Sequence, residues 1–188
     1  MSKLLLYLYM VLCTISMIRA QEKNEELSEI AAFGAEEDGT IIYTSKGNIT
    51  CRLYYKEAPF SVGSFIELAK SGFYNGLTFY GIIPKYVIKA GDPNGHNYEI
   101  AAEMGQSHQR GALAWLRLPD YQNPEKLSSG SQFYITLENL SDWDQEYSVF
   151  GQIVHGMDIL NLLEEGDVIK NIEIFSFNKT ENIRKLYN

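Results

Sequence analysis

The chain has 188 residues, 45% of them hydrophobic, and its 24 acidic residues outnumber its 16 basic residues. The resulting net charge of −8 argues against nucleic acid and anionic membrane surfaces as partners, because both attract basic protein surfaces. The length is sufficient for one domain that buries its own hydrophobic core.

The first twenty residues have the pattern of a signal peptide. Lys3 provides a positive charge, residues 4–18 form an uncharged apolar run, and Ala20 is a small residue suited to cleavage. The run is short for a membrane span and a polar stretch follows it, so we expect no span after cleavage. An uncleaved anchor is the alternative interpretation. The pattern therefore predicts an exported protein, in the periplasm or secreted.

Cleavage after residue 20 would leave one domain with polar ends. It removes Lys3 and Arg19, so that 14 basic residues face 24 acidic residues and the net charge becomes −10. Cys51 is then the one remaining cysteine, which excludes an internal disulfide, and its strand-like surroundings predict a buried, inert thiol. We expect a flexible acidic leader at 21–38, the folded domain at 39–177 and a polar tail at 178–188.

Short predicted strands alternate with turn residues along most of the domain. Residues 40–44 and 48–55 are rich in β-branched and aromatic side chains, and turn residues 45–47 between them predict a hairpin. Six further strands are predicted at 77–83, 87–90, 112–118, 132–137, 148–154 and 169–177.

Two helices are predicted between these strands. The first follows Pro59, with Ser61 as its N-cap and Gly72 at its end, because apolar residues recur between them at helical spacing. A second, short helix fits residues 158–164, where leucines and an isoleucine form an apolar stripe. Many short strands with two helices predict a mainly β protein, a closed barrel with a helix over each end.

Four segments are specific in their combination, order and spacing, although each alone would be a weak signal. They are Ala58–Phe79, Ile83–Pro93, Ser129–Ile135 and Tyr147–Asp158. In combination they resemble the cyclophilins, the peptidyl-prolyl cis-trans isomerase family, and the resemblance covers residues 40–175. The insert at residues 123–128 is similar to bacterial members, particularly those of Bacteroidetes type.

The resemblance implies a closed eight-stranded antiparallel barrel capped by two helices, with substrate in an outer groove. The implied reaction is rotation about an X-Pro bond, which faces a barrier of about 18–20 kcal/mol unaided and needs no cofactor. In the family an arginine donates a hydrogen bond to the prolyl nitrogen and so favours the twisted transition state. The implied partners are proline-containing unfolded or extended polypeptides, bound by a monomer.

The main departure from the family pattern is at the catalytic arginine. Phe79 and Ile83-Pro84 fix the alignment on both sides and leave Gly81 at the arginine position. Removal of one preorganised donor typically costs about 10²–10³ in rate, so we expect weak activity. Arg117 and Lys89 are possible substitutes, and Arg117 is preferred because its planar fork suits an amide. Alternatively, both are solvated residues of the rim.

The other groove positions map mostly to apolar and aromatic residues. By resemblance, the substrate-binding residues are Tyr86, Val87, Lys89, Leu116, Arg117, Gln132, Tyr134, Trp143 and Tyr147. Leu116 is bulkier than its family counterpart and is expected to narrow the groove. The shortened loop at residues 94–97 is expected to remove one rim.

Three functional hypotheses remain open at this point. The first is an isomerase that assists the folding of exported proteins, weakened by Gly81. The second is a non-catalytic chaperone or scaffold module of the cell envelope that binds proline segments through the same groove. The third is a purely structural barrel with a vestigial groove. No metal is expected, because His96, His108 and His155 do not share a ligand spacing, and His108 resembles a structural turn before a strand.

Overall fold

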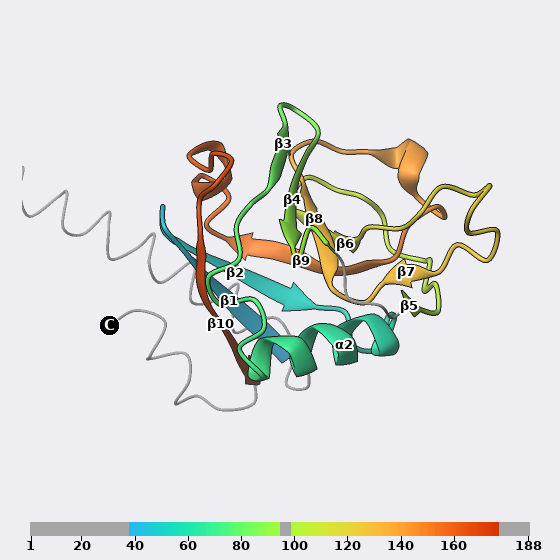
Figure 1. Cartoon of the computed structure of the whole chain (residues 1–188), viewed down its shortest axis with the longest axis horizontal. Helices are drawn as coiled ribbons and strands as arrows, with labels where there is room; N and C mark the ends of the chain where they lie inside the picture. The colour runs from blue at the N-terminus through green and yellow to red at the C-terminus, as the bar shows by residue number, and fades with distance from the viewer. Residues whose placement is uncertain (1–37, 95–98, 177–188) are drawn as a thin grey trace, which may run out of the picture. The chain divides into compact units, whose positions relative to one another are not determined.

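The structure is a computed structural model that describes residues 38–94 and 99–176, so the expected signal peptide and tail and nearly all of the leader lie outside it. One antiparallel sheet of eight strands dominates this part of the chain (Figure 1). In chain order its strands are β1 (Asp38–Thr44), β2 (Asn48–Leu53), β3 (Gly81–Ile83), β4 (Val87–Gly91), β6 (Ala112–Trp115), β8 (Gln132–Thr136), β9 (Val149–His155) and β10 (Ile169–Ser176). In space the order is β10-β1-β2-β9-β6-β8-β4-β3. The expectation of a mainly β fold with eight antiparallel strands is confirmed.

The sheet is curled into a half-barrel, and the closed barrel that was expected is not confirmed. The strand order ends at β10 and β3, which share no ladder among the described residues. The two edges approach each other just before β3, where Thr78 and Val168 form a single antiparallel bridge and the Phe79 N–H donates to the Asp167 carbonyl at 2.9 Å. Beyond that bridge the Glu165 carboxylate accepts from the Ile82 N–H at 3.0 Å. On the edge of β3 that does not pair with β4, the Glu165 side chain therefore accepts the hydrogen bond that a neighbouring strand would otherwise accept.

The one α-helix in the described residues is α2 (Pro59–Lys70), which begins three residues earlier than a helix with Ser61 as its N-cap would begin. Ser61 is therefore not the N-cap. Pro59 occupies the first turn, and the Glu103 carboxylate accepts from the Phe60 and Ser61 N–H groups at 3.0 and 2.8 Å. Glu103 lies 42 residues beyond Ser61, so no local pattern could reveal this cap.

The predicted end of the helix at Gly72 is confirmed. Gly72 has φ of 75°, a left-handed conformation that glycine adopts without steric cost. Its N–H donates to the Ala69 carbonyl, and the Phe73 N–H donates to the Leu68 carbonyl, both at 3.0 Å. This pair of bonds is the Schellman motif, which satisfies the last free carbonyls of a helix.

The second predicted helix, at residues 158–164, is not confirmed as an α-helix. The structure has a three-residue 3-10 helix there, η2 (Ile159–Asn161), and another such turn at η1 (Ser141–Trp143). The segment between Gly156 and Gly166 is too short to repay the cost of nucleating an α-helix. A two-stranded sheet of β5 (Glu99–Ile100) and β7 (Ser128–Ser129) was not predicted. No helix in the described residues is long and apolar enough to cross a membrane.

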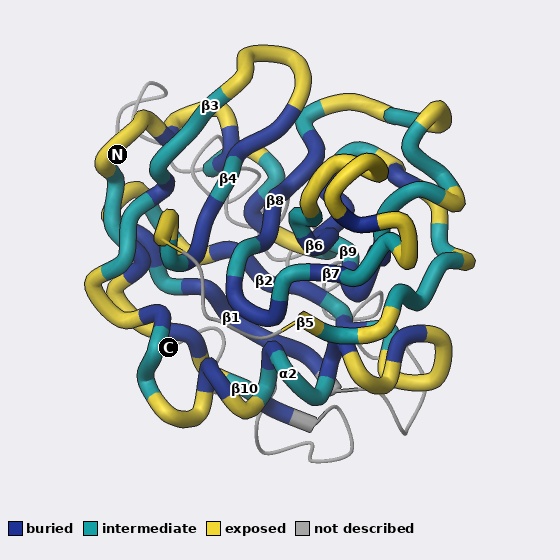
Figure 2. Tube along the Cα trace, turned by 45° about the vertical axis from the view of Figure 1, so that its right-hand side comes forward, coloured by how far each residue is buried: buried dark blue, intermediate teal, exposed yellow. Residues whose placement is uncertain are grey.

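Alternate residues of the strands form two separate hydrophobic clusters on the two faces of the sheet. Figure 2 shows how much of the strands is buried, in dark blue. The first cluster, called the inner core here, lies on the face that α2 covers and is centred on Phe65, Tyr74, Trp115, Phe133 and Phe150. The Trp115 and Phe150 rings stack with centroids 4.6 Å apart. Cys51 is buried in this core, as expected, and burial raises the pKa of its thiol.

The second cluster, called the outer cluster here, lies on the opposite face of the same strands. Its buried residues are Val87, Ala112, Ala114, Tyr134 and Val149, and the partly buried residues that pack on them are Tyr54, Leu116, Leu140, Trp143 and Tyr147. Because successive side chains of a strand point to opposite faces, Tyr134 belongs to this cluster while Phe133 and Ile135 belong to the inner core. The sheet thus buries one face under α2 and offers the other to the surface.

Candidate functional site

The outer cluster brings four of the expected groove aromatics into mutual contact. The Tyr86 and Trp143 rings meet edge to face at 5.2 Å, and Tyr134 meets Trp143 in the same way at 5.5 Å. Tyr147 lies 4.9 Å from Trp143 and 5.9 Å from Tyr134. Tyr134 is fully buried, whereas Tyr86 is 40% exposed. The rings therefore form a graded surface, from a buried floor to an open edge.

Strand pairing places Gly81 beside this aromatic surface. In the register of the sheet Gly81 of β3 is opposite Lys89 of β4, and Lys89 is opposite Tyr134 of β8. Directly opposite residues of antiparallel strands point to the same face, so these three residues form one row on the outer face. The row continues to Ala114 of β6, which is a member of the outer cluster.

Lys89 covers the space that a side chain at Gly81 would enter. A Cβ atom at position 81 would lie 3.5 Å from Lys89 Cδ and no closer than that to any other atom. This is ordinary van der Waals contact, so a larger side chain fits at this position if Lys89 moves slightly. Within residues 38–94 and 99–176 the Lys89 ammonium has no hydrogen bond or ion pair. Among the described residues Lys89 is therefore a cation without a partner, next to Gly81.

Arg117 has a different environment. Its side chain is 6% exposed, and it donates to the Glu146 carbonyl at 2.7 Å and the Glu146 carboxylate at 3.0 Å. It also donates to the Leu118 carbonyl at 3.0 Å and to the Asp120 carboxylate at 2.5 Å. Four of its five N–H groups are thus engaged by the protein itself. The preference for Arg117 as the substitute donor is not supported by this geometry.

The remaining expected groove residues lie on the same face but do not all contact one another. Val87 is buried within the outer cluster, and Leu116 packs against it as a partly buried residue. Gln132 is half-buried at the start of β8, opposite Gly91. The role of these residues in binding stays a prediction. The loop at 94–97 lies mostly outside the described residues, so the expected loss of one rim also stays a prediction.

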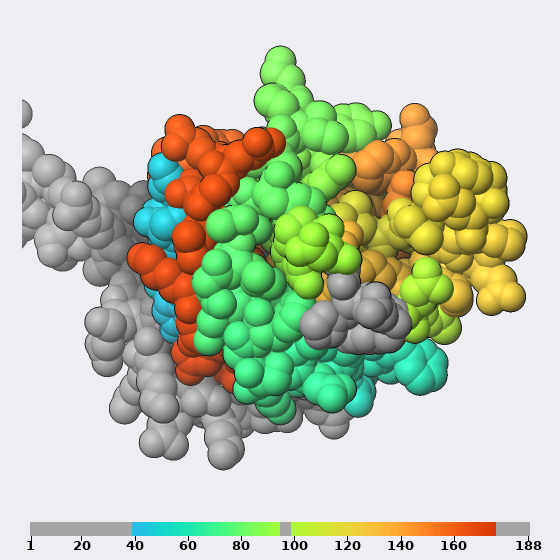
Figure 3. Space-filling model, viewed as in Figure 1, coloured from blue at the N-terminus to red at the C-terminus, as the bar shows by residue number. Residues whose placement is uncertain are grey.

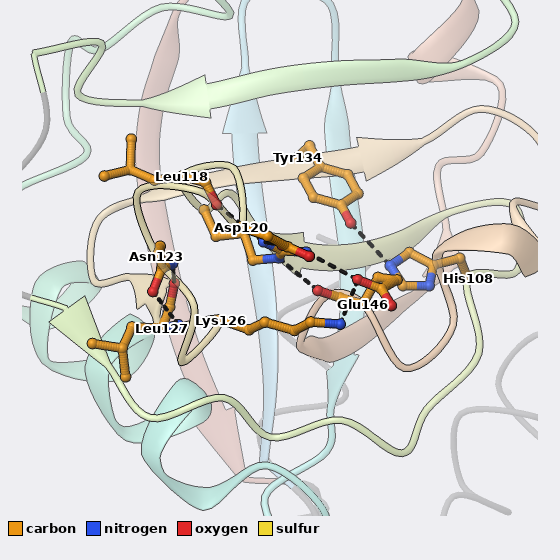
Figure 4. Close-up of polar contacts among 9 residues, drawn as sticks. His108, Leu118, Asp120, Asn123, Lys126, Leu127, Tyr134 and Glu146 are labelled. Carbon is orange, nitrogen blue, oxygen red and sulfur yellow. Dashed lines mark hydrogen bonds and ion pairs between the residues drawn. The ribbon is translucent and has the colours of Figure 1, made fainter.

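His108 is a site residue that the sequence interpretation missed. Its ring is buried, and it lies within 6.1–6.3 Å of the Tyr134, Trp143 and Tyr147 rings. Nε2 lies 2.9 Å from the Tyr134 hydroxyl (Figure 4). Nδ1 lies 2.9 Å from Asp144 Oδ1. The Tyr134 hydroxyl is a buried polar group that needs a partner, and this requirement is the signal that could have drawn attention to a histidine.

The hydrogen bonds fix the tautomer of His108. The Asp144 carboxylate accepts from the His108 backbone N–H at 2.7 Å and also contacts Nδ1. Since an ionised carboxylate only accepts, Nδ1 carries the proton, and Nε2 of the neutral ring accepts from the Tyr134 hydroxyl. Burial lowers the pKa of His108, although Asp144 opposes this effect. Burial alone would raise the pKa of Asp144, but the hydrogen bonds from His108 bring it below its usual range.

The outer cluster is distinct from a cavity that is lined in part by residues of the β3–β4 hairpin. That cavity has a volume of about 280 Å³, and its lining includes Ile82, Leu137 and Leu160. Ile82 packs against the inner core, whereas its neighbour Gly81 belongs to the outer row. In the described part of the chain no three histidine, cysteine or acidic residues are grouped as a metal site.

An eight-stranded curled sheet with an aromatic cluster on its outer face defines a cyclophilin-like protein. The comparisons with known proteins identify the family. The sequence matches the family described as cyclophilin type peptidyl-prolyl cis-trans isomerase/CLD over residues 40–182. The chain therefore belongs to the cyclophilin-type peptidyl-prolyl isomerases.

Individual relatives agree with this assignment. A peptidyl-prolyl cis-trans isomerase of Helicobacter pylori is 35% identical over 164 residues, which cover 82% of this chain and 93% of that protein. Peptidyl-prolyl cis-trans isomerase B of Bacillus subtilis is 31% identical and covers 72% of this chain and 96% of its own. A crystal structure of a Cryptosporidium parvum cyclophilin-type isomerase is 26% identical, covers 74% of this chain and 98% of its own, and has a TM-score of 0.68.

Proposed function

We propose that this protein is a weak peptidyl-prolyl isomerase that acts on proline-containing segments of exported polypeptides. The observation that carries this proposal is the row Gly81–Lys89–Tyr134 on the outer face of the sheet. The row retains an aromatic floor for a proline ring but has no guanidinium at Gly81. Another structure of the Cryptosporidium parvum isomerase was obtained in the presence of the dipeptide Ala-Pro, which supports a proline-containing ligand here.

Lys89 is the cation best placed to retain part of the activity. Its stem lies over Gly81, and its ammonium has no partner among the described residues. An ammonium is a compact point charge without the planar fork of arginine, so it would stabilise the twisted amide less well. The expected rate is therefore lower than that of an arginine-bearing relative by about 10²–10³, the usual cost of one preorganised donor.

A protease-coupled assay on short X-Pro peptides tests this proposal. We expect Gly81→Arg to raise kcat, because a Cβ atom at this position meets only ordinary contacts and leaves room for a side chain. Lys89→Ala should abolish the residual turnover, and Lys89→Arg should retain it. Activity of the unmodified protein equal to that of an arginine-bearing relative would refute the idea of a weakened site.

The second candidate function is non-catalytic binding of proline segments, as a chaperone or scaffold of the cell envelope. The intact cluster of Tyr86, Tyr134, Trp143 and Tyr147 favours it, because stacking on proline needs rings and no catalytic donor. Titration with a proline peptide should change the fluorescence of Trp143, and Trp143→Phe should lose the signal. Binding without turnover selects this function, and no binding at millimolar peptide would favour a purely structural barrel.

Export is part of the proposal and has its own test. The apolar run at residues 4–18 and the small residue Ala20 support a cleaved signal peptide. Expression of the full chain in a Gram-negative host should give a periplasmic or secreted protein whose first residue is Gln21. A protein that stays in the cytoplasm with its first twenty residues intact would exclude export.

A further inference from the structure

Arg117 connects two segments that are distant in sequence, the loop at residues 118–127 and the turn that carries Tyr147. The loop contributes the Leu118 carbonyl and the Asp120 carboxylate as acceptors, and the turn contributes the carbonyl and carboxylate of Glu146. The guanidinium is nearly buried, although the side chains of its partners Asp120 and Glu146 are 62% and 39% exposed. Interactions of a buried charge are costly to break, because removal of one partner leaves the other uncompensated.

The loop is also closed internally and fastened a second time to Glu146. Asn123 is 5% exposed, and its side chain donates to the Leu127 carbonyl at 2.8 Å and accepts from the Leu127 N–H at 2.9 Å. Lys126 donates to the Glu146 carboxylate at 2.6 Å, as Figure 4 shows. The loop projects from the surface (the yellow segment in Figure 3) and yet is held at its base. It is therefore built as an ordered element.

The same guanidinium supports the aromatic surface of the groove. Arg117 Cζ lies 4.8 Å from the centre of the Tyr147 ring, within the range of a cation–π contact. Tyr147 in turn contacts Trp143 and Tyr134. One side chain thus contacts both the loop and one ring of the cluster.

We infer that Arg117 is a positioning residue that holds Tyr147 and the loop 118–127 together as one rigid wall of the groove, and so sets affinity for the substrate segment. This inference rests on the proposed function for its substrate. Arg117 affects binding through its contact with Tyr147 and takes no direct part in the rotation of the X-Pro bond. Loss of Arg117 therefore weakens binding, whereas loss of Lys89 slows the chemical step.

The first test separates KM from kcat. Arg117→Ala should raise KM, or the dissociation constant of a proline peptide, about tenfold and leave kcat within about twofold. Arg117→Lys keeps the charge but loses the fork, so it should recover only part of the affinity. The matched control is Arg110→Ala. Arg110 also bonds a backbone carbonyl, that of Leu137 at 3.0 Å, but it lines the cavity away from the groove, so its loss should leave KM unchanged.

A double-mutant cycle tests the route through Tyr147. In the Tyr147→Leu background, Arg117→Ala should add no further loss of affinity, because the ring that Arg117 supports is already absent. A full additional tenfold loss would show that Arg117 acts on substrate by another route. A fall in kcat at constant KM in Arg117→Ala would overturn the inference and make Arg117 the catalytic donor.

Amide hydrogen exchange tests the role of Arg117 without any substrate. In Arg117→Ala, exchange should accelerate together at residues 118–127 and 144–147, while Arg110→Ala should leave both segments protected. Unchanged exchange in both segments would refute the rigid wall even if proline peptides bind. Conversely, Arg117→Ala could accelerate exchange in both segments although the protein binds no proline peptide. That result would support the structural role of Arg117 and reject the proposed function.

Discussion

The inner core and the outer cluster use alternate residues of the same strands, and they differ in chemistry. The inner core packs phenylalanine, leucine and isoleucine against α2 and is almost fully buried. The outer cluster combines small buried residues, Ala112, Ala114 and Val149, with aromatic rings. Tyr134 is fully buried, whereas Trp143 and Tyr147 are partly exposed. Each of these larger rings has an apolar body and a polar tip, which suits a surface that must bind and release. One face of the sheet thus supports the fold, and the other is the face on which we propose that substrate binds.

Truncation of the inner core should have the largest effect on stability. Phe133 is fully buried and contacts the Phe65, Tyr74 and Phe150 rings. Phe133→Ala should lower the free energy of unfolding by about 3–5 kcal/mol, because it removes apolar contacts and leaves a cavity. Urea denaturation followed by circular dichroism measures this loss. A loss below about 1 kcal/mol would contradict the separation of the two faces.

Removal of the neighbouring hydroxyl on the outer face should cost less. Tyr134→Phe keeps the ring but leaves His108 Nε2 without its hydrogen-bond donor in a buried site. The expected loss of unfolding free energy is about 1–3 kcal/mol. The same denaturation experiment applies, and Tyr43→Phe is the control, since the Tyr43 hydroxyl makes an exposed hydrogen bond to Glu173. Equal losses of unfolding free energy in both variants would show that the buried hydrogen bond to His108 stabilises the protein no more than an exposed one.

Truncation of an outer ring should affect binding more than stability. Trp143 contacts the Tyr86, Tyr134 and Tyr147 rings, so Trp143→Ala disrupts the ring cluster at its centre. We expect at least a tenfold weaker affinity for a proline peptide, about 1.4 kcal/mol. Isothermal titration calorimetry measures it without the tryptophan signal. Unchanged affinity would remove Trp143 from the groove.

The smallest expected effect is a loss of stability in mild acid that originates beneath the outer cluster. Burial lowers the pKa of His108 in the folded protein below its ordinary value of 6.5, so the unfolded chain takes up the proton first. Stability from this residue is complete above about pH 6.5 and declines as the pH falls through the lower folded pKa. Asp144, whose folded pKa is also lowered, adds a separate loss below about pH 4.

Unfolding free energies measured from pH 7.5 to pH 5 test the His108 contribution. His108→Gln should flatten the profile in that window, and the decline below pH 4 should become shallower, because Asp144 loses its hydrogen bond from the imidazole ring. A profile that is identical in both proteins between pH 7.5 and pH 5 would exclude His108 as its source.

Local patterns predicted most of the strands and the end of α2, and they failed where the partner was distant. The hairpin of β1 and β2 follows from two β-branched runs around a turn, which is short-range information. The start of α2 was misplaced because its cap, Glu103, comes from another part of the chain. The strands β5 and β7 have two residues each, too few to show a period.

The candidate site was only partly predictable for the same reason. Resemblance to the family was enough to propose Tyr86, Tyr134, Trp143 and Tyr147 as neighbours, and the structure does bring these rings together. It could not reveal His108, since its partners Tyr134 and Asp144 lie 26 and 36 residues away. The hydrogen-bond partner of a buried polar group must lie close to it in the folded structure, but it can be distant in the sequence.

The sequence by itself determined the family and the antiparallel strands, because both depend on residue identity and short-range order. Only the tertiary structure decided the environments of the two candidate cations. Strand pairing puts Lys89 across from Gly81 with its ammonium free of described partners, and chain packing surrounds Arg117 with Glu146, Asp120 and Tyr147. The hydrogen bonds of Arg117 are used within the protein, so this residue holds the structure in place. Lys89 has no such partner among the described residues, and we therefore propose Lys89 as the cation that contacts substrate.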